Sequence, residues 1–255
     1  MALLAADIGN TQTHLGVFDG DRLRESWRLP TDAEATGDEL AVSIVGLFEL
    51  AGLTREDVDA AIVSSVVPRL APEYERGFRR HFGVECLVVG PSLSIGMPIR
   101  TESPHELGAD RIVNAVAARE RYDGPCVVVD FGTAITYDAI SGDGEYLGGV
   151  IAPGIEISIE ALARRAAALP KIELAEPEAV IGRTTQQSIQ AGIVYGFAGQ
   201  IDGILARLRG ELGPATEVIA TGGYAPAIVP FCAEIETVDD LLTLTGLRLT
   251  WERNR

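Results

Sequence analysis

The sequence has almost no lysine. Lys171 is the single lysine among 21 basic residues, and no Gly-x-x-x-x-Gly-Lys-Ser/Thr pattern surrounds it. This absence excludes a P-loop nucleotide site, and the strand lysine typical of protein kinases is missing as well. Any phosphate chemistry must therefore use backbone amides, hydroxyl groups, arginine and metal ions.

Positive charge, cysteine and long apolar runs are also scarce. The formal net charge is -16, so nucleic acid and anionic membranes are not expected partners. The three cysteines, Cys86, Cys126 and Cys232, form no close pair, which favours reduced thiols. No apolar run reaches the length of a membrane span, and Ala2 to Ala6 lacks a basic leader. We therefore expect an unanchored cytoplasmic protein.

One short pattern occurs twice. Asp7-Ile8-Gly9-Asn10-Thr11 ends an apolar run, and Asp130-Phe131-Gly132-Thr133 does the same in the second half. Each copy is followed by two further strand-like runs, and the aspartates are 123 residues apart in a chain of 255. The spacing indicates a repeat of whole domains rather than of a short unit.

The order of elements supports this duplication. Apolar periodicity predicts β-β-β-α-β-α-β-α in each half, with one inserted helix, Ile155 to Ala168, in the second. Each half should form a mixed five-stranded sheet with helices on both faces, an α/β architecture. We expect two domains, residues 1–122 and 123–255, facing each other across a cleft. This arrangement resembles the ribonuclease H-like domains of the actin-like ATPase and sugar kinase superfamily.

The repeated pattern suits a triphosphate held by a divalent metal. Gly9 and Gly132 let the backbone approach closely, and Asp7 would orient Mg²⁺ through water. Hydroxyl and amide donors to phosphate come from Asn10, Thr11, Thr13 and Thr133. A plain hairpin turn is the alternative, since Asp, Gly and Asn are common in turns. Two copies in equivalent contexts favour the phosphate loop.

Two other segments carry candidate chemistry. Gly222 and Gly223 follow the apolar run Val218-Ile219, and would allow close packing of a nucleotide. Asp110 and Arg111 open a helix, where an anion is favoured and Asp110 could accept a proton from a substrate hydroxyl. From spacing alone, an ordinary acidic residue that caps the first helical turn is the favoured interpretation of Asp110.

These segments together resemble one family. The motifs are Asp7 to Thr11, Gly108-Ala109-Asp110-Arg111, Asp130 to Ala134, Gly148 to Gly154 and Thr221-Gly222-Gly223, in the order seen in type III pantothenate kinases. The resemblance covers essentially the whole chain. It implies ATP-dependent phosphorylation of pantothenate to 4'-phosphopantothenate, the first step of coenzyme A biosynthesis.

The resemblance also implies roles for individual residues. Asp110 would be the catalytic base and Asp130 the ligand of a monovalent cation, K⁺ or NH₄⁺, while Thr185 would bind substrate across a homodimer interface. Pantothenate would contact Gly108, Ala109, Asp110 and Arg111. ATP would contact Asp7, Ile8, Gly9, Asn10, Thr11, Gln12, Thr13 and His14, together with Thr133, Gly222 and Gly223.

Several alternatives stay open at this point. His14 could simply face solvent on the second strand, and Thr101-Glu102-Ser103 stands where the family often has a tyrosine and an asparagine. The predicted helix Thr185 to Leu212 is apolar on more than one face, which fits a homodimer or burial within one subunit. Another small-molecule kinase of the same fold, or a catalytically silent nucleotide-binding regulator, would share the phosphate loops.

Overall fold

The computed structural model describes residues 1–90, 93–166 and 169–255, and the chain divides into two compact units. Unit 1 contains Met1–Met97, Glu102–Ala117 and Leu241–Arg255. Unit 2 contains Pro98–Thr101 and Ala118–Asp240. Each unit is built around one five-stranded sheet.

The sheet of unit 1 has the strand order β3-β2-β1-β4-β5. Its strands are β1 (Ala2–Ile8), β2 (Gln12–Asp19), β3 (Arg22–Pro30), β4 (Ala60–Ser65) and β5 (Cys86–Val88). The central strand β1 pairs antiparallel with β2 and parallel with β4. Its apolar run is nearly continuous because both faces of the sheet are covered.

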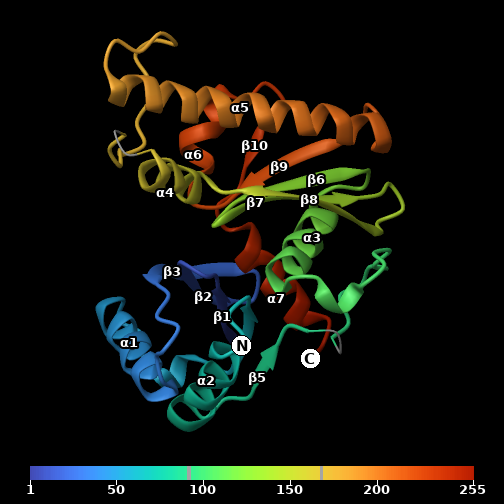
Figure 1. The fold of residues 1–255 in the computed structure, drawn as a ribbon. Helices are drawn as coiled ribbons and strands as arrows, with labels where there is room; N and C mark the ends of the chain where they lie inside the picture. The colour runs from blue at the N-terminus through green and yellow to red at the C-terminus, as the bar shows by residue number, and fades with distance from the viewer. Residues whose placement is uncertain (91–92, 167–168) are drawn as a thin grey trace. The chain divides into compact units, whose positions relative to one another are not determined.

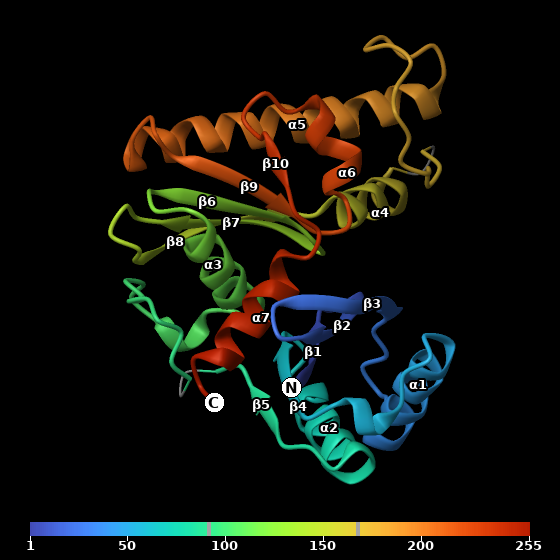
Figure 2. The ribbon, with the colours of Figure 1, turned by 180° about the vertical axis from the view of Figure 1, so that it is seen from behind.

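Helices cover both faces of this sheet (Figure 1, Figure 2). Different residues of β1 contribute to the core on each face. On one face, α1 (Gly37–Leu50) and α2 (Leu70–Gly77) form a core with Leu4, Ala6 and Ile8. On the other face, α7 (Leu242–Glu252) and the first turns of α3 (Ala109–Arg121) pack against Leu3 and Ala5. We call these the α1/α2 face and the α3/α7 face.

The sheet of unit 2 has the matching order β10-β9-β6-β7-β8. Its strands are β6 (Cys126–Phe131), β7 (Ala134–Ile140), β8 (Tyr146–Pro153), β9 (Glu217–Thr221) and β10 (Thr237–Val238). The helices α4 (Ile155–Arg165), α5 (Thr185–Leu212) and α6 (Ala225–Ile228) form its main core with Val127, Val129 and Phe131. Figure 1 shows α5 running along this sheet.

Short helical turns complete the described chain. Three are 3-10 turns, Arg55–Asp57, Pro104–Glu106 and Val229–Phe231, and one is a π-helical turn, Phe78–Phe82, that continues α2. The three cysteines are free, with Cys126 buried and the other two half-buried. Within the described residues, no helix has the length and apolar character needed to cross a membrane.

The duplicated α/β architecture is confirmed, including the inserted helix α4. The predicted end of that helix at Ala168 lies outside the described residues. The compact units differ from a division at residue 122 because α7 belongs to unit 1. Gly246 of α7 lies directly against the Val113 carbonyl of α3, and Thr243 Oγ1 donates to Asn114 Oδ1 at 2.8 Å. This buried contact ties the C-terminal helix to the first sheet.

Candidate active site

The first phosphate-loop candidate is a glycine turn between β1 and β2. The Gly9 amide donates to the Gln12 carbonyl at 3.0 Å, and a Cβ atom at Gly9 would lie 2.9 Å from that oxygen. Only glycine fits this turn without displacing its backbone. The residues between, Asn10 and Thr11, are exposed, as is Gln12. The turn therefore presents backbone and polar side chains at the carboxyl end of β1.

Strand pairing aligns three polar residues across the α3/α7 face. Asp7 of β1 is the register partner of His14 on β2 and of Ser64 on β4. Paired residues of neighbouring strands point to the same side of a sheet, and Asp7 follows Leu3 and Ala5 on this face. His14 is only 8% exposed, so the solvent-facing alternative for it is wrong. We call His14, Asp7 and Ser64 the first row.

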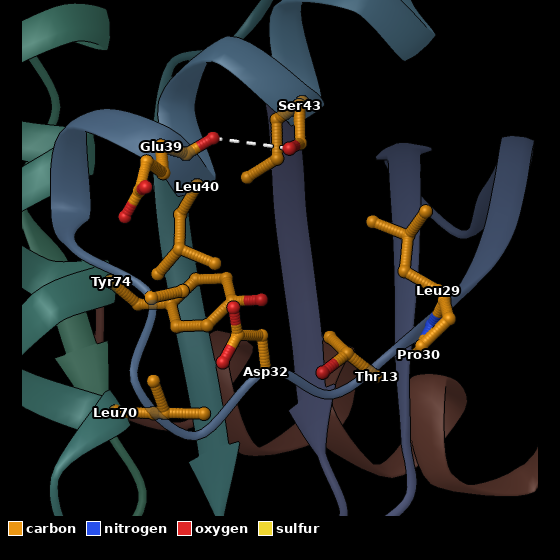
Figure 3. A pocket seen from close by; sticks show the side chains of 11 residues that line it. Thr13, Leu29, Pro30, Asp32, Glu39, Leu40, Ser43, Leu70 and Tyr74 are labelled. Atoms are coloured by element: carbon orange, nitrogen blue, oxygen red, sulfur yellow. Dashed lines mark hydrogen bonds between the residues drawn. The ribbon is translucent and has the colours of Figure 1, made fainter.

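Thr13 lies on the opposite face from Asp7 and His14. Its side chain is 2% exposed, and its Oγ1 is 2.9 Å from Thr31 Oγ1. It lines a pocket of about 290 Å³ on the α1/α2 face, shared with Asp32, Glu39 and Tyr74 (Figure 3). The sheet thus separates Thr13 from the first row.

The start of α3 holds the candidate base. Asp110 is half-buried, and its Oδ1 accepts a hydrogen bond from the Arg111 amide at 2.8 Å. Burial raises the pKa of Asp110, although the Arg111 amide and guanidinium act in the opposite direction. A Cβ atom at Gly108 would lie 2.5 Å from Asp110 Oδ1, so a side chain there would displace the Asp110 carboxylate from this position.

The packing of α3 fixes the side of the sheet on which Asp110 lies. Ile112 and Val113, the residues that follow Arg111, pack in the core of the α3/α7 face, and Ala109 borders that core. The helix that begins at Ala109 therefore lies over the face that carries the first row. Asp110 and Asp7 belong to the same side of unit 1.

The second loop candidate, Asp130 to Ala134, is enclosed by two glycine segments of unit 2. The Gly132 amide donates to the Ala134 carbonyl at 3.1 Å, so this turn is one residue shorter than the first copy, in which Gly9 donates to Gln12. Gly222 has φ of +95°, and a Cβ atom there would lie 2.5 Å from Asp130 Oδ1. A Cβ atom at Gly154 would overlap the Thr133 carbonyl. Three motifs that are distant in sequence therefore meet at the loop from Asp130 to Ala134.

Unit 2 repeats the row of polar residues. Asp130 of β6 is the register partner of Thr136 on β7 and of Thr221 on β9. We call Thr136, Asp130 and Thr221 the second row. The turn that follows Thr221 carries Gly222 and Gly223, so both predicted glycines adjoin this row.

A buried carboxylate beside the second row was not among the predicted site residues. Asp138 is 0% exposed and lies on the same face as Asp130, as the pairing of Val128 with Asp138 shows. Tyr146 donates to Asp138 Oδ1 at 2.6 Å, and Thr136 donates to Oδ2 at 3.4 Å. The sequence feature that could have indicated this buried carboxylate is the single acidic residue inside the apolar run Ile135 to Ile140.

The predicted substrate residue Thr185 and the family departure at Thr101 lie elsewhere in unit 2. Thr185 is the first residue of α5, after Thr184, whose hydroxyl accepts from the Gln187 amide. Thr185 borders a groove of about 430 Å³ whose other lining residues are mostly apolar: Leu162, Leu169, Ser188, Ile189, Gly192 and Ile193. Thr101, at the departure from the family pattern, has a buried hydroxyl with no protein partner among the described residues.

Comparisons with known proteins identify the family of the chain. The family model described as type III pantothenate kinase matches residues 3–207. The chain is 52% identical over 260 residues to a type III pantothenate kinase of Streptomyces avermitilis, covering 99% of this chain and 98% of that protein.

Solved structures share the fold at lower identity. A conserved putative Baf family transcriptional activator from Campylobacter jejuni aligns with a TM-score of 0.60 and 21% identity, covering 98% of this chain and 97% of the other. An inorganic polyphosphate/ATP-glucomannokinase from an Arthrobacter strain aligns with a TM-score of 0.51 and 15% identity, covering 98% and 96%. The fold is that of the actin-like ATPases and sugar kinases, and the chain belongs to the type III pantothenate kinase family.

Proposed function

We propose that this kinase transfers the terminal phosphoryl group of ATP to the primary hydroxyl of pantothenate, with Asp110 as the catalytic base. Family membership supports this reaction, and the position of Asp110 supports its assignment as the base. Asp110 lies on the side of the first sheet that bears Asp7, at a helix start with the Arg111 amide at its carboxylate. Gly108, Ala109 and Arg111 would contact pantothenate beside it.

Residues of the first loop fit the magnesium nucleotide. The turn at Gly9 offers backbone amides where a side chain would not fit, and Asp7 supplies a carboxylate at its base. The described residues contain no group of three or more His, Cys, Asp or Glu side chains placed to hold a metal. Magnesium commonly uses one or two carboxylates, water and substrate phosphate, so Asp7 would hold it through water. Its chemistry would be neutralisation of phosphate charge.

The second loop would contact ATP and hold a monovalent cation, K⁺ or NH₄⁺. Asp130 supplies the negative charge, and Thr133 with Gly222 and Gly223 would adjoin ATP. Phosphoryl transfer depends mainly on positioning and charge neutralisation. Asp110 would orient the pantothenate hydroxyl and accept its proton as the oxygen attacks phosphorus.

The Asp110→Asn variant tests this assignment. Asparagine keeps the shape of the side chain but cannot accept the proton, so we expect kcat to fall about 100-fold or more. The dissociation constant for Mg-ADP, measured by calorimetry, should stay within about twofold because Asp110 is assigned to the acceptor. Turnover near that of the wild type would remove Asp110 from its role.

The same assay separates two other functions. Phosphate transfer to other hydroxyl acceptors but not to pantothenate would identify a different small-molecule kinase. Tight ATP binding without transfer to any acceptor would identify a silent nucleotide-binding regulator. Replacing potassium by sodium in the assay tests the proposed cation. This replacement should lower turnover if Asp130 holds K⁺.

We also propose a cytoplasmic homodimer in which α5 contributes to the interface. Thr185 adjoins an apolar groove, and Val180 and Ile181, which precede it, are 70% and 83% exposed. Exposed large apolar side chains and an apolar groove are each typical of an interface. Sedimentation analysis of the purified protein measures the mass, and a monomer at micromolar concentration would contradict the proposal.

A further inference from the structure

Ser64 is a buried hydroxyl that the proposed reaction does not yet use. It lies near the carboxyl end of β4, its side chain is 0% exposed, and its Oγ has no hydrogen-bond partner among the described residues. Most buried polar atoms in proteins are hydrogen bonded, and leaving one unbonded is destabilising. The hydroxyl therefore needs a partner that the described residues do not supply, such as water or a bound ligand.

The position of Ser64 indicates where that partner lies. Ser64 is the register partner of Asp7, and both belong to the α3/α7 face. The next residue, Ser65, points to the other face and is fully bonded. Its hydroxyl donates to the Val67 carbonyl at 2.9 Å and accepts from the Val67 amide at 3.1 Å. Two adjacent serines thus differ in that one closes a local turn and the other adjoins the acidic residue of the phosphate loop.

The second half of the chain repeats this arrangement. Thr221 is the parallel register partner of Asp130, as Ser64 is of Asp7. Both halves therefore place a hydroxyl residue beside the loop aspartate, on the parallel neighbouring strand. Thr221 precedes the glycine pair assigned to the nucleotide. The duplicated geometry points to a role for the hydroxyl at both aspartates.

We propose that Ser64 is a positioning residue for the magnesium side of the site. Its hydroxyl shares with the Asp7 carboxylate the water molecules that surround the magnesium ion of the bound nucleotide. The inference rests on the proposed role of Asp7. A hydroxyl can donate to one oxygen and accept from another, so it can order water beside a carboxylate.

The test compares Ser64→Ala with Ser65→Ala. Removing an unbonded buried hydroxyl should leave the melting temperature of the free enzyme unchanged or raised, whereas Ser65→Ala should lower it by removing two hydrogen bonds. Affinity for Mg-ADP should fall about three- to tenfold in Ser64→Ala, the scale of one lost hydrogen bond. Affinity for ADP in excess chelator should not change. Ser65→Ala should bind both forms as the wild type does.

Asp7→Asn, measured in parallel, separates this inference from the proposed function. If Asp7→Asn abolishes the preference for Mg-ADP over ADP while Ser64→Ala retains it, the role of Ser64 is refuted and that of Asp7 stands. If Asp7→Asn also keeps the preference, the assignment of Asp7 is refuted together with that of Ser64. A lowered melting temperature in Ser64→Ala would mean that the hydroxyl is structural, which also overturns the inference.

Discussion

Replacing Gly222 with alanine should damage both the stability of unit 2 and its proposed cation site. Gly222 has φ of +95°, a conformation that L residues with a side chain rarely adopt. The added Cβ atom would lie 2.5 Å from Asp130 Oδ1 and 2.6 Å from the Phe131 amide nitrogen. The carboxylate can rotate away, but Phe131 is held in β6 by its pairing with Ile135. The backbone overlap therefore cannot be relieved by a side chain alone.

Two contributions set the size of the effect. Holding a residue with a side chain in a sparsely populated conformation costs about 1–3 kcal/mol. Overpacking against a fixed backbone adds about 1–3 kcal/mol. The sum, about 2–6 kcal/mol, is a large part of the roughly 5–15 kcal/mol that stabilises a folded domain. It corresponds to a fall in melting temperature on the order of 4–24 °C for a chain of this size.

Urea unfolding and the potassium dependence of turnover measure the two effects. Gly210→Ala is the matched control: Gly210 lies in α5, a Cβ atom there would meet nothing within 4 Å, and a helical alanine is favoured over glycine by about 1 kcal/mol. That control should be slightly stabilised and fully active. For Gly222→Ala we expect a lower unfolding midpoint and a higher potassium requirement. An unchanged midpoint with unchanged potassium activation would refute the close packing of Gly222 against Asp130.

Two further predictions concern Asp110 and Thr185. Burial raises the pKa of Asp110 above its ordinary value of 3.8, so the ionised form destabilises the fold above that raised pKa. The cost declines as pH falls from the raised pKa towards 3.8 and is absent below 3.8. Asp110→Asn should therefore melt at a higher temperature than the wild type at neutral pH. The difference in melting temperature should shrink on acidification, and a difference that stays constant with pH would contradict the raised pKa of Asp110. If Thr185 serves the partner subunit, mixing and re-equilibrating inactive Asp110→Asn with impaired Thr185→Ala should restore about a quarter of the sites, as a twofold dimer requires. No recovery would place Thr185 in its own subunit's site or outside it.

The repeat made the fold predictable from sequence. Asp7 and Asp130 each end a buried apolar strand before a glycine turn, and this spacing predicted both sheets. Gly9 lies at a close backbone approach within its own turn, as its sequence context indicated. Local patterns were sufficient here because this turn depends on residues that are near in sequence.

Features that depend on register or on distant contacts were not predictable in this way. A shift of one residue between β1 and β2 would exchange the faces of Thr13 and His14, and the sequence of the turn alone does not fix that register. Ser64 gains its importance only from its pairing with Asp7, since the local sequence does not distinguish it from Ser65. The docking of α7 on unit 1 depends on Gly246 meeting Val113, far apart in the chain.

The two rows differ in a way that explains why duplicated loops would hold different ions. The first row combines a carboxylate with one imidazole and one hydroxyl, His14 and Ser64, and so offers few oxygen atoms. Magnesium gives up its water reluctantly, and a carboxylate with a water-ordering hydroxyl suits it. The second row, Asp130 with Thr136 and Thr221, offers only oxygen atoms among its polar side chains. Potassium exchanges its water for protein oxygens more readily, so the replacement of His14 by Thr136 in the second copy favours the proposed division of the two cations.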